Sequence, residues 1–354
     1  MKEGWTYKKL GEVCEILDSR RKPITKSKRE TGTIPYYGAT GLLDYVKDYI
    51  FDERLVLLGE DGAKWGSGEN SSYIIEGKSW VNNHAHVLRP KRDILVDELL
   101  VYYLNFSNLL PYITGVTVPK LNQEKMRSIE IPIGPIDDQL SIVSNLDAAF
   151  AHIDSLKANA EKQLVEARQL FQAELAECMK PKEGWEEKSF VNCIDKVPKQ
   201  KQVKSKDYKS FGNYPIVSQE KELISGYWDD DSYLYKHERP IIIFGDHTKE
   251  IKYVDFNFVV GADGTQILSP KKGIDARFFY YALVATPLRT LGYARHFKLL
   301  KEKTFFIPPL DTQDQIVFRL DALSANIKKL EEVQRKTLAE CDALKQAMLR
   351  EVFE

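Results

Sequence analysis

The sequence has few cysteines and no long apolar run, and each absence excludes a class of protein. The four cysteines (Cys14, Cys178, Cys193 and Cys341) lie far apart and form no C-x-x-C pair. A disulfide framework or a zinc site is therefore not expected, and a reducing cytoplasm is the expected compartment. No apolar run reaches the roughly 18 residues of a membrane span, and the N-terminus lacks the apolar stretch of a signal peptide. We expect a cytoplasmic protein that makes no membrane contact.

The sequence also lacks an excess of charge of either sign, since its formal net charge is -1 at pH 7. Bulk charge therefore predicts no particular partner. Hydrophobic residues make up 43% and charged residues 29% of the 354 positions, as in ordinary globular proteins. This length is sufficient for two domains with separate cores.

The sequence repeats itself. KEGW at 2–5 recurs at 182–185, and at the same offset LRPK at 88–91 faces LSPK at 268–271. Further along, PIDDQLSIVSNLD from Pro135 faces PLDTQDQIVFRLD from Pro309. Matches that stay in order over most of the chain, with small shifts, indicate an internal duplication.

Each copy is predicted to begin with an α+β domain, residues 1–134 in the first copy and 182–307 in the second. Short apolar runs such as LVLLG and IIIFGD alternate with Gly, Asn and Asp turns, which is typical of strands. Helices are expected over 97–106 and 276–285.

Each copy is predicted to end in one long helix, over 135–181 and 308–354. Apolar residues recur there at intervals of three and four, and no Gly or Pro interrupts either helix after its opening proline. Some 40 residues at about 1.5 Å each make a rod of roughly 60 Å. Such a rod must bury its apolar stripe against another helix, so we expect an antiparallel coiled coil with internal pseudo-two-fold symmetry.

This layout resembles the specificity subunit of type I restriction–modification enzymes over essentially the whole chain. The likeness is carried by the repeated EGW, by IPIGPIDDQ at 131–139 and by IPPLDTQ at 307–313. Before these helix starts stand TGVTVPKLNQEKMRSIEIP and LGYARHFKLLKEKTFFIP, segments that close each target-recognition domain in the family.

The resemblance implies a subunit without catalysis of its own. Each target-recognition domain would read one half of a bipartite, asymmetric sequence in double-stranded DNA, and the helices would set the gap. Two methyltransferase subunits would dock on the helices, and restriction–translocase subunits would join them. S-adenosylmethionine, ATP and magnesium are expected on those partners, which methylate adenine and cut DNA, and no cofactor is expected on this chain.

Missing catalytic motifs agree with that implication. No G-x-x-x-x-G-K-[ST] loop is present, and GEDGAKWGSG lacks its spacing. No Asn/Asp-Pro-Pro-Tyr/Phe stretch, by which amino-methyltransferases resemble one another, is present either. His84 and His86 have no third ligand nearby in the sequence, so they predict polar strand residues rather than a metal site.

Three kinds of segment supply candidate DNA contacts. Basic loops offer cations that can neutralise DNA phosphates, although a run of lysines and arginines can also be a solvated, mobile loop that binds nothing. These loops contribute Arg20, Arg21, Lys22, Lys26 and Lys28 in the first copy, and Lys199, Lys201, Lys204 and Lys206 in the second. The segments before the long helices mix amide, hydroxyl and cationic donors that can pair with base edges; they contribute Thr117, Lys120 and Asn122, and Tyr293, Arg295, His296 and Lys298. Turns after apolar strands add Lys64, His247 and Lys249.

Two other functions remain open from the residues alone. Asp231, Glu250 and Lys252 are spaced like the magnesium-binding set of a nuclease, although the first copy has no counterpart and a surface hairpin explains them equally well. A coiled-coil scaffold whose domains bind protein is the other alternative. Binding to DNA through several phosphates would weaken steeply with salt, which distinguishes it from the scaffold.

Overall fold

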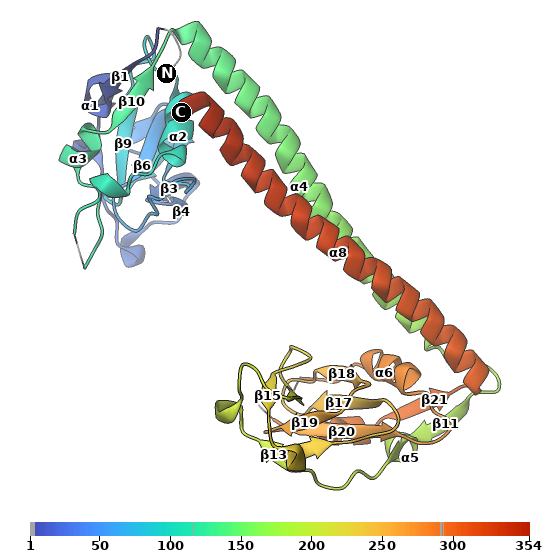
Figure 1. Cartoon of the computed structure of the whole chain (residues 1–354). Helices are drawn as coiled ribbons and strands as arrows, with labels where there is room; N and C mark the ends of the chain where they lie inside the picture. Colours follow the sequence, from blue (N-terminus) through green and yellow to red (C-terminus); the bar gives the residue numbers. More distant parts are fainter. Residues whose placement is uncertain (1–3, 116, 291, 293) are drawn as a thin grey trace. The chain divides into compact units, whose positions relative to one another are not determined.

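The computed structural model describes residues 4–115, 117–290, 292 and 294–354. Two compact units form, one from the chain up to Glu161 together with Arg335–Glu354, the other from Lys162–Gln334. Each unit holds one α+β domain and part of each long helix (Figure 1). We call the α+β domains domain 1 (residues 4–134) and domain 2 (residues 182–307).

Domain 1 contains two four-stranded sheets and a separate strand pair. The first sheet is antiparallel, in the order β2 (Cys14–Ile16), β9 (Ala85–Pro90), β6 (Leu55–Gly59) and β7 (Ser72–Ile75). The second has the order β4 (Gly41–Val46), β3 (Ile34–Gly38), β8 (Lys78–Val81) and β5 (Phe51–Asp52), with β3 and β8 parallel. The pair is β1 (Thr6–Lys9) with β10 (Glu130–Ile133), and the helices are α1 (Leu10–Val13), α2 (Asp97–Phe106) and α3 (Gln123–Arg127). The 3-10 turns are η1 (Asp18–Arg20), η2 (Lys26–Lys28) and η3 (Leu110–Tyr112).

Strand β6 lies in the middle of domain 1, and all five of its residues are buried. Because neighbouring side chains of a strand point to opposite faces, Val56 and Leu58 pack into one apolar cluster and Leu55 and Leu57 into another. The first cluster includes residues of α2, and the second includes residues of β5 and β8. The unbroken apolar run LVLLG therefore marks a strand covered on both faces.

Domain 2 repeats this order of elements, which confirms the predicted duplication. Its first sheet is β12 (Ile194–Asp195), β20 (Thr265–Pro270), β17 (Ile241–Gly245) and β18 (Ile251–Val254), again antiparallel with a fully buried strand, β17, inside. Its second sheet joins β13 (Gln202–Val203), β19 (Phe258–Gly261), β14 (Tyr214–Val217) and β15 (Gly226–Trp228), with β16 (Leu234–Tyr235) beside β19. The pair is β11 (Glu186–Ser189) with β21 (Thr304–Ile307), and the helices are α5 (Phe190–Cys193), α6 (Ala276–Val284) and α7 (Phe297–Lys301). Two 3-10 turns are η4 (Ser205–Asp207) and η5 (Asp231–Tyr233).

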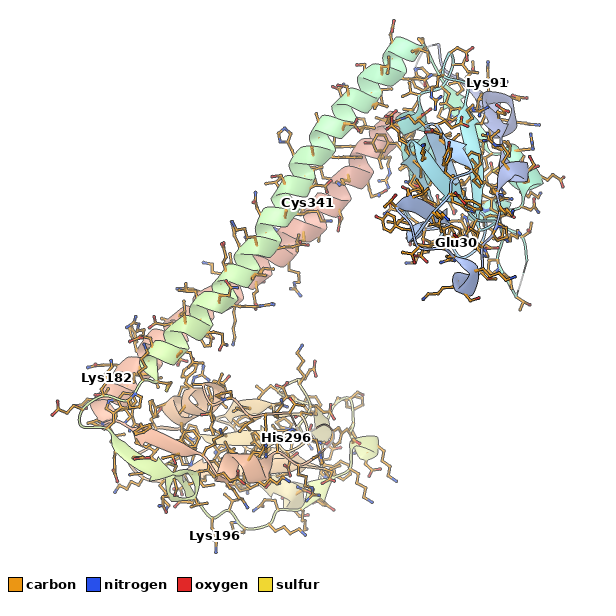
Figure 2. All side chains as sticks on the ribbon, turned by 180° about the vertical axis from the view of Figure 1, so that it is seen from behind. Glu30, Lys91, Lys182, Lys196, His296 and Cys341 are labelled. Carbon is orange, nitrogen blue, oxygen red and sulfur yellow. The ribbon has the colours of Figure 1, made fainter. Side chains whose placement is uncertain are left out.

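The two long helices, α4 (Ile136–Cys178) and α8 (Leu310–Phe353), pack side by side (Figures 1 and 2). In the first unit Lys157 Nζ lies 2.7 Å from Asp342 Oδ1, and in the second Arg168 Nη2 lies 2.9 Å from Glu331 Oε1. Residue numbers rise along α4 as the partner numbers fall along α8, so the helices are antiparallel, as predicted. Among the helices of the described residues, none combines the length and the apolarity needed to cross a membrane.

The buried seam between these helices is narrower than the apolar stripe in the sequence. Ile153 on α4 and Cys341 on α8 are buried, whereas Leu156 on α4 and Leu344 on α8 are more than half exposed. A pair of helices covers only the face turned toward the partner, so part of a wide apolar stripe stays in solvent.

A glutamine near the start of each long helix joins the helix to its own domain. Gln139 has no exposed surface; its Oε1 accepts from the Val96 N–H (3.0 Å), and its Nε2 donates to the carbonyls of Ile94 (2.9 Å) and Gly134 (2.8 Å). The bonds to Ile94 and Val96 tie α4 to the loop that leads into α2, and the third bond joins it to Gly134 directly after β10. The glutamine in the PIDDQ motif is therefore a structural clamp.

Domain 2 has the same clamp. Gln313 is also fully buried, accepts from the Asp275 N–H (2.7 Å) and donates to the carbonyls of Gly273 (3.0 Å) and Pro308 (2.8 Å). The PLDTQ motif thus fixes the start of α8 to the loop before α6.

Candidate nucleic-acid interface

In both domains a buried acid follows the fully buried strand, Glu60 after β6 and Asp246 after β17. The backbone carbonyl of Glu60 accepts from the Leu121 N–H (2.8 Å), and that of Asp246 accepts from the His296 N–H (2.7 Å). These bonds bring the segment that precedes α3 or α7 to the end of the central strand. We call residues 117–122 and 294–298 the recognition segments of domain 1 and domain 2. They occupy equivalent places in the two domains.

The same acids hold one cation of each segment. In domain 1, Lys120 Nζ lies 2.7 Å from Glu60 Oε1, and the lysine side chain is 42% exposed. In domain 2, Arg295 Nε lies 3.9 Å from Asp246 Oδ2, and the arginine side chain is 68% exposed. Each buried carboxylate thus lies beside a cation whose outer part remains in solvent, at hydrogen-bond distance from Lys120 and at ion-pair distance from Arg295. This is a suitable arrangement for a side chain that contacts DNA, since the acid limits its conformations without covering it.

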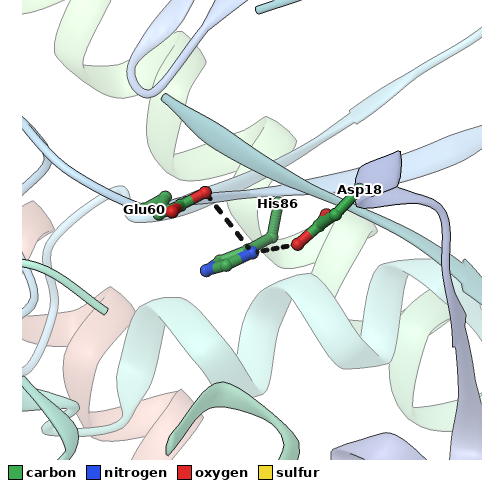
Figure 3. Close-up of side chains that lie close together, drawn as sticks. All are labelled: Asp18, Glu60 and His86. Carbon is green, nitrogen blue, oxygen red and sulfur yellow. Dashed lines mark hydrogen bonds and ion pairs between the residues drawn. The ribbon is translucent and has the colours of Figure 1, made fainter. Parts of the chain in front are cut away.

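Domain 1 surrounds its acid with a buried ion-pair network (Figure 3). His86, fully buried on β9, lies with Nδ1 2.6 Å from Asp18 Oδ2, while its Nε2 donates to the Leu121 carbonyl (2.7 Å). Arg21 pairs with Glu60 and donates to the Ala85 carbonyl (2.7 Å). The network therefore links the basic loop, the central sheet and the recognition segment of domain 1.

The pKa values of the two carboxyl groups in this network are lowered. Burial raises the pKa of Asp18, but hydrogen bonds from His86, the Val87 N–H and Gln123 more than offset it. Burial also raises the pKa of Glu60, and bonds from Lys120 and Arg21 outweigh that effect. Both groups are therefore held as carboxylates.

Asp18, Glu60 and His86 offer ligand atoms within 4.8 Å of one another, close enough for a metal ion. Sequence reasoning found no third ligand for the histidine pair, because Asp18 and Glu60 meet His86 only in the fold. In the structure, however, Arg21 and Lys120 already neutralise Glu60, and both nitrogens of His86 are hydrogen-bonded. The cluster is complete as an ion-pair network, so it does not fit a resident metal.

The basic loops differ in how many cations they leave available. Arg20 pairs with Glu53 (3.4 Å) and lies over the Phe51 ring, and Lys201 donates to Ser232 Oγ (3.0 Å). The remaining lysines are exposed and form no ion pair with any residue in the described ranges: Lys22, Lys26, Lys28, Lys199, Lys204 and Lys206. Figure 2 shows neighbouring Lys196 at the surface of domain 2. Arg21 differs from these lysines, because its guanidinium is paired with Glu60 and hydrogen-bonded to the Ala85 carbonyl inside domain 1.

In the recognition segments, Thr117 and Lys298 are exposed. Asn122 caps α3, since its Oδ1 accepts from the Lys125 N–H (2.9 Å). His296 is only 1% exposed and its Nδ1 donates to the Asp246 carbonyl (3.0 Å). Burial leaves His296 no surface for DNA, so its predicted direct contact is corrected to a role in holding the segment. Tyr293 lies outside the described residues.

The turns after the buried strands present two lysines. Lys64 is largely exposed, with Glu69 3.9 Å away. Lys249 has a positive φ of 64° and donates to Thr290 Oγ1 (2.8 Å), and His247 beside it is half-buried. Sequence reasoning missed the acids Glu60 and Asp246 in these turns. The acid directly after the glycine in LVLLGE and IIIFGD, in both copies, is the signal that could have found them.

The nuclease alternative is not favoured by the structure. Lys252 is buried and donates to the carbonyls of Ser218 (2.9 Å) and Glu222, and burial lowers its pKa. Asp231 begins an exposed 3-10 turn. Neither Asp231 nor Glu250 belongs to a metal-capable cluster of three within the described part of the chain.

Comparison with known proteins identifies the family. The model of the type I restriction modification DNA specificity domain matches residues 2–167 and again 182–340. A protein of Haemophilus influenzae named as a type I restriction enzyme specificity subunit is 40% identical over 41% of this chain and 37% of its own length. One of Methanocaldococcus jannaschii, named as the MjaX specificity subunit, is 24% identical over 98% of this chain and 92% of its own length.

The first four curated relatives are matched over only 34 to 39% of their length. At the level of fold, a solved chain described under complex assembly and conformational transition of the type I R-M system superposes with a TM-score of 0.73. It is 17% identical, and the match covers 100% of this chain and 98% of that one. Since one family model matches both halves and together these matches span most of the sequence, the chain belongs to the type I restriction-modification DNA specificity family.

Proposed function

We propose that this chain selects the DNA sequence for a type I restriction–modification complex, with each domain reading one half of a bipartite site. The observation that carries the proposal is the shared anchor. In two domains of different sequence, a buried acid forms an ion pair with a partly exposed cation, Lys120 or Arg295, at the same place. A duplicated scaffold with diverged loops suits two readers of different half-sites.

Contacts with DNA divide into two groups under this proposal. The exposed lysines of the basic loops neutralise phosphates, which gives affinity without sequence preference. Lys120 and Arg295 reach base edges in the major groove, where lysine and arginine pair best with guanine. Thr117, Asn122 and Lys298 lie in the same segments and complete the contact surface.

The chain itself carries out no catalytic step in this proposal. The antiparallel helices α4 and α8 set the gap between the half-sites and dock two methyltransferase subunits, which restriction–translocase subunits then join. S-adenosylmethionine, ATP and magnesium belong to those partners. The Gln139 and Gln313 clamps support this division, because they fix each helix to the domain beside it.

Mapping adenine methylation in the source genome, with the gene intact and deleted, tests the proposal. We expect a two-part motif with a fixed gap that disappears on deletion and returns when the gene is restored. Exchange of residues 1–134 for the domain of a relative should change one half of that motif. A motif that persists without the gene, or an exchange that changes both halves, would overturn the proposal.

A further inference from the structure

Domain 2 contains a polar hollow of about 400 Å³ beside Arg295. It is lined by the basic loop that carries Lys199, by Gln202 at the start of β13, and by Gln266 near the start of β20. Asp263, in the turn before β20, lies on the same hollow. Two of the candidate DNA contacts, Lys199 and Arg295, therefore meet at one place that their positions in the sequence did not predict.

Gln266 holds the position that His86 holds in domain 1. His86 faces Leu58 across β9 and β6, and Gln266 faces Phe244 across β20 and β17, at the same place in the duplicated sheet. In domain 1 the space beside this position is filled by Asp18 and Arg21, and His86 uses both nitrogens internally. The equivalent space in domain 2 is the open hollow.

Two amides and one lysine of the hollow are left without a polar partner among the described residues, whereas Arg295 pairs with Asp246 and Asp263 Oδ1 accepts from the Gly264 N–H (2.7 Å). Within the described ranges, the side-chain amides of Gln202 and Gln266 make no hydrogen bond, and Lys199 forms no ion pair. Gln266 is half-buried and lines the hollow, and Gln202, which also lines it, is exposed. Amides hydrated in a recess can exchange water for a ligand's donors and acceptors at low cost.

The mixture of groups indicates which ligand fits. A phosphate group offers acceptors only and would meet the exposed carboxylate of Asp263 as well as the two cations. A base-pair edge offers donors and acceptors together, which suits two amides, one arginine and one carboxylate: glutamine pairs with adenine, arginine with guanine, and aspartate with the cytosine amino group.

We infer that this hollow is where domain 2 reads base edges, with Gln202, Gln266 and Arg295 as specificity-determining residues. The inference rests on the proposed function and deepens it. It also assigns different chemistry to the two domains, because the equivalent region of domain 1 is closed by its own ion pairs. Domain 1 then reads its half-site without a contact at the position of His86.

The test uses the full chain in its cells, with methylation mapped for wild type, Gln266→Leu, Gln266→Glu and Lys272→Gln. Lys272 is an exposed lysine beyond the far end of β20, so its variant controls for general surface changes. The purified chains are then titrated with duplexes that carry the wild-type motif or single base-pair changes in either half. Thermal melting, together with retained reading of the first half-site, shows that each variant is folded.

We expect both Gln266 variants to lose about tenfold to a hundredfold of discrimination at one or two base pairs of the second half-site, the value of one bidentate base contact. The first half-site and the Lys272→Gln variant should be unchanged. Equal weakening on all duplexes, a changed first half-site, or unchanged discrimination would each overturn the inference. Failure of the proposed function is recognised separately, since wild type would then give no bipartite motif.

Discussion

Replacement of Gln139 by methionine tests whether the helix-start glutamine is the clamp between domain 1 and α4. Methionine has nearly the same volume, so the packing is retained while the three hydrogen bonds are lost. The Val96 N–H and the carbonyls of Ile94 and Gly134 then lack their partner. A buried unpaired group costs about 1–3 kcal/mol. These three backbone groups are half-buried, so water replaces part of the loss, and we expect a total of about 3 kcal/mol.

Hydrogen exchange followed by mass spectrometry measures this loss locally. About 3 kcal/mol corresponds to a roughly hundredfold faster exchange for amides that open with the clamp. Peptides that cover 94–106 should therefore exchange faster in Gln139→Met, while domain 2 keeps its wild-type rates. Gln313→Met should likewise speed up exchange in peptides that cover 273–284, while domain 1 keeps its wild-type rates.

Gln334→Met is the matched control for the clamp. Gln334 is a half-buried glutamine on α8 whose Nε2 donates to Gln163 Oε1 (2.7 Å) in a bond that is open to solvent. Its replacement removes one solvent-accessible bond and should leave both domains unaffected. If Gln139→Met exchanges no faster than Gln334→Met, or if both domains loosen equally, the clamp interpretation is wrong.

Three further predictions concern the network, the recognition segments and a thiol. The pKa of Glu60 is lowered in the folded state, so the ionised Glu60 stabilises the fold fully above its unfolded pKa of about 4.3, and this stabilisation is lost as the pH falls through the folded value. The melting temperature of Glu60→Gln should therefore depend less on pH between 6 and 3 than that of wild type. An equal dependence would contradict the network. Lys120→Met should relax one half of the methylated motif and Arg295→Met the other, as read by methylation mapping; relaxation of both halves by either variant would exclude one domain per half-site. Burial and the nearby Asp97 carboxylate raise the pKa of the Cys14 thiol to about 12, so iodoacetamide should label it in unfolded but not in native protein at pH 7, and rapid native labelling would show that the thiol is accessible.

The sequence alone determined the features that depend on local pattern. The α2 helix spans Asp97–Phe106 as predicted, and the long helices begin within two residues of their predicted starts. Helical periodicity and the absence of helix breakers are properties of neighbouring residues, so they are readable without the fold. The duplication is readable for the same reason, since both copies keep their order along the chain.

Only the tertiary structure decided which polar groups meet. Asp18, Glu60 and His86 are far apart in the sequence, and the β2-β9-β6 order of the sheet brings them together. His296 and Arg295 are adjacent and equally polar in sequence, yet one is buried and the other exposed. The same position of the duplicated sheet is closed around His86 and open at Gln266. A polar side chain either forms hydrogen bonds inside the protein or stays available to a binding partner, depending on its neighbours in space. The packing of segments that are distant in the sequence determines those neighbours.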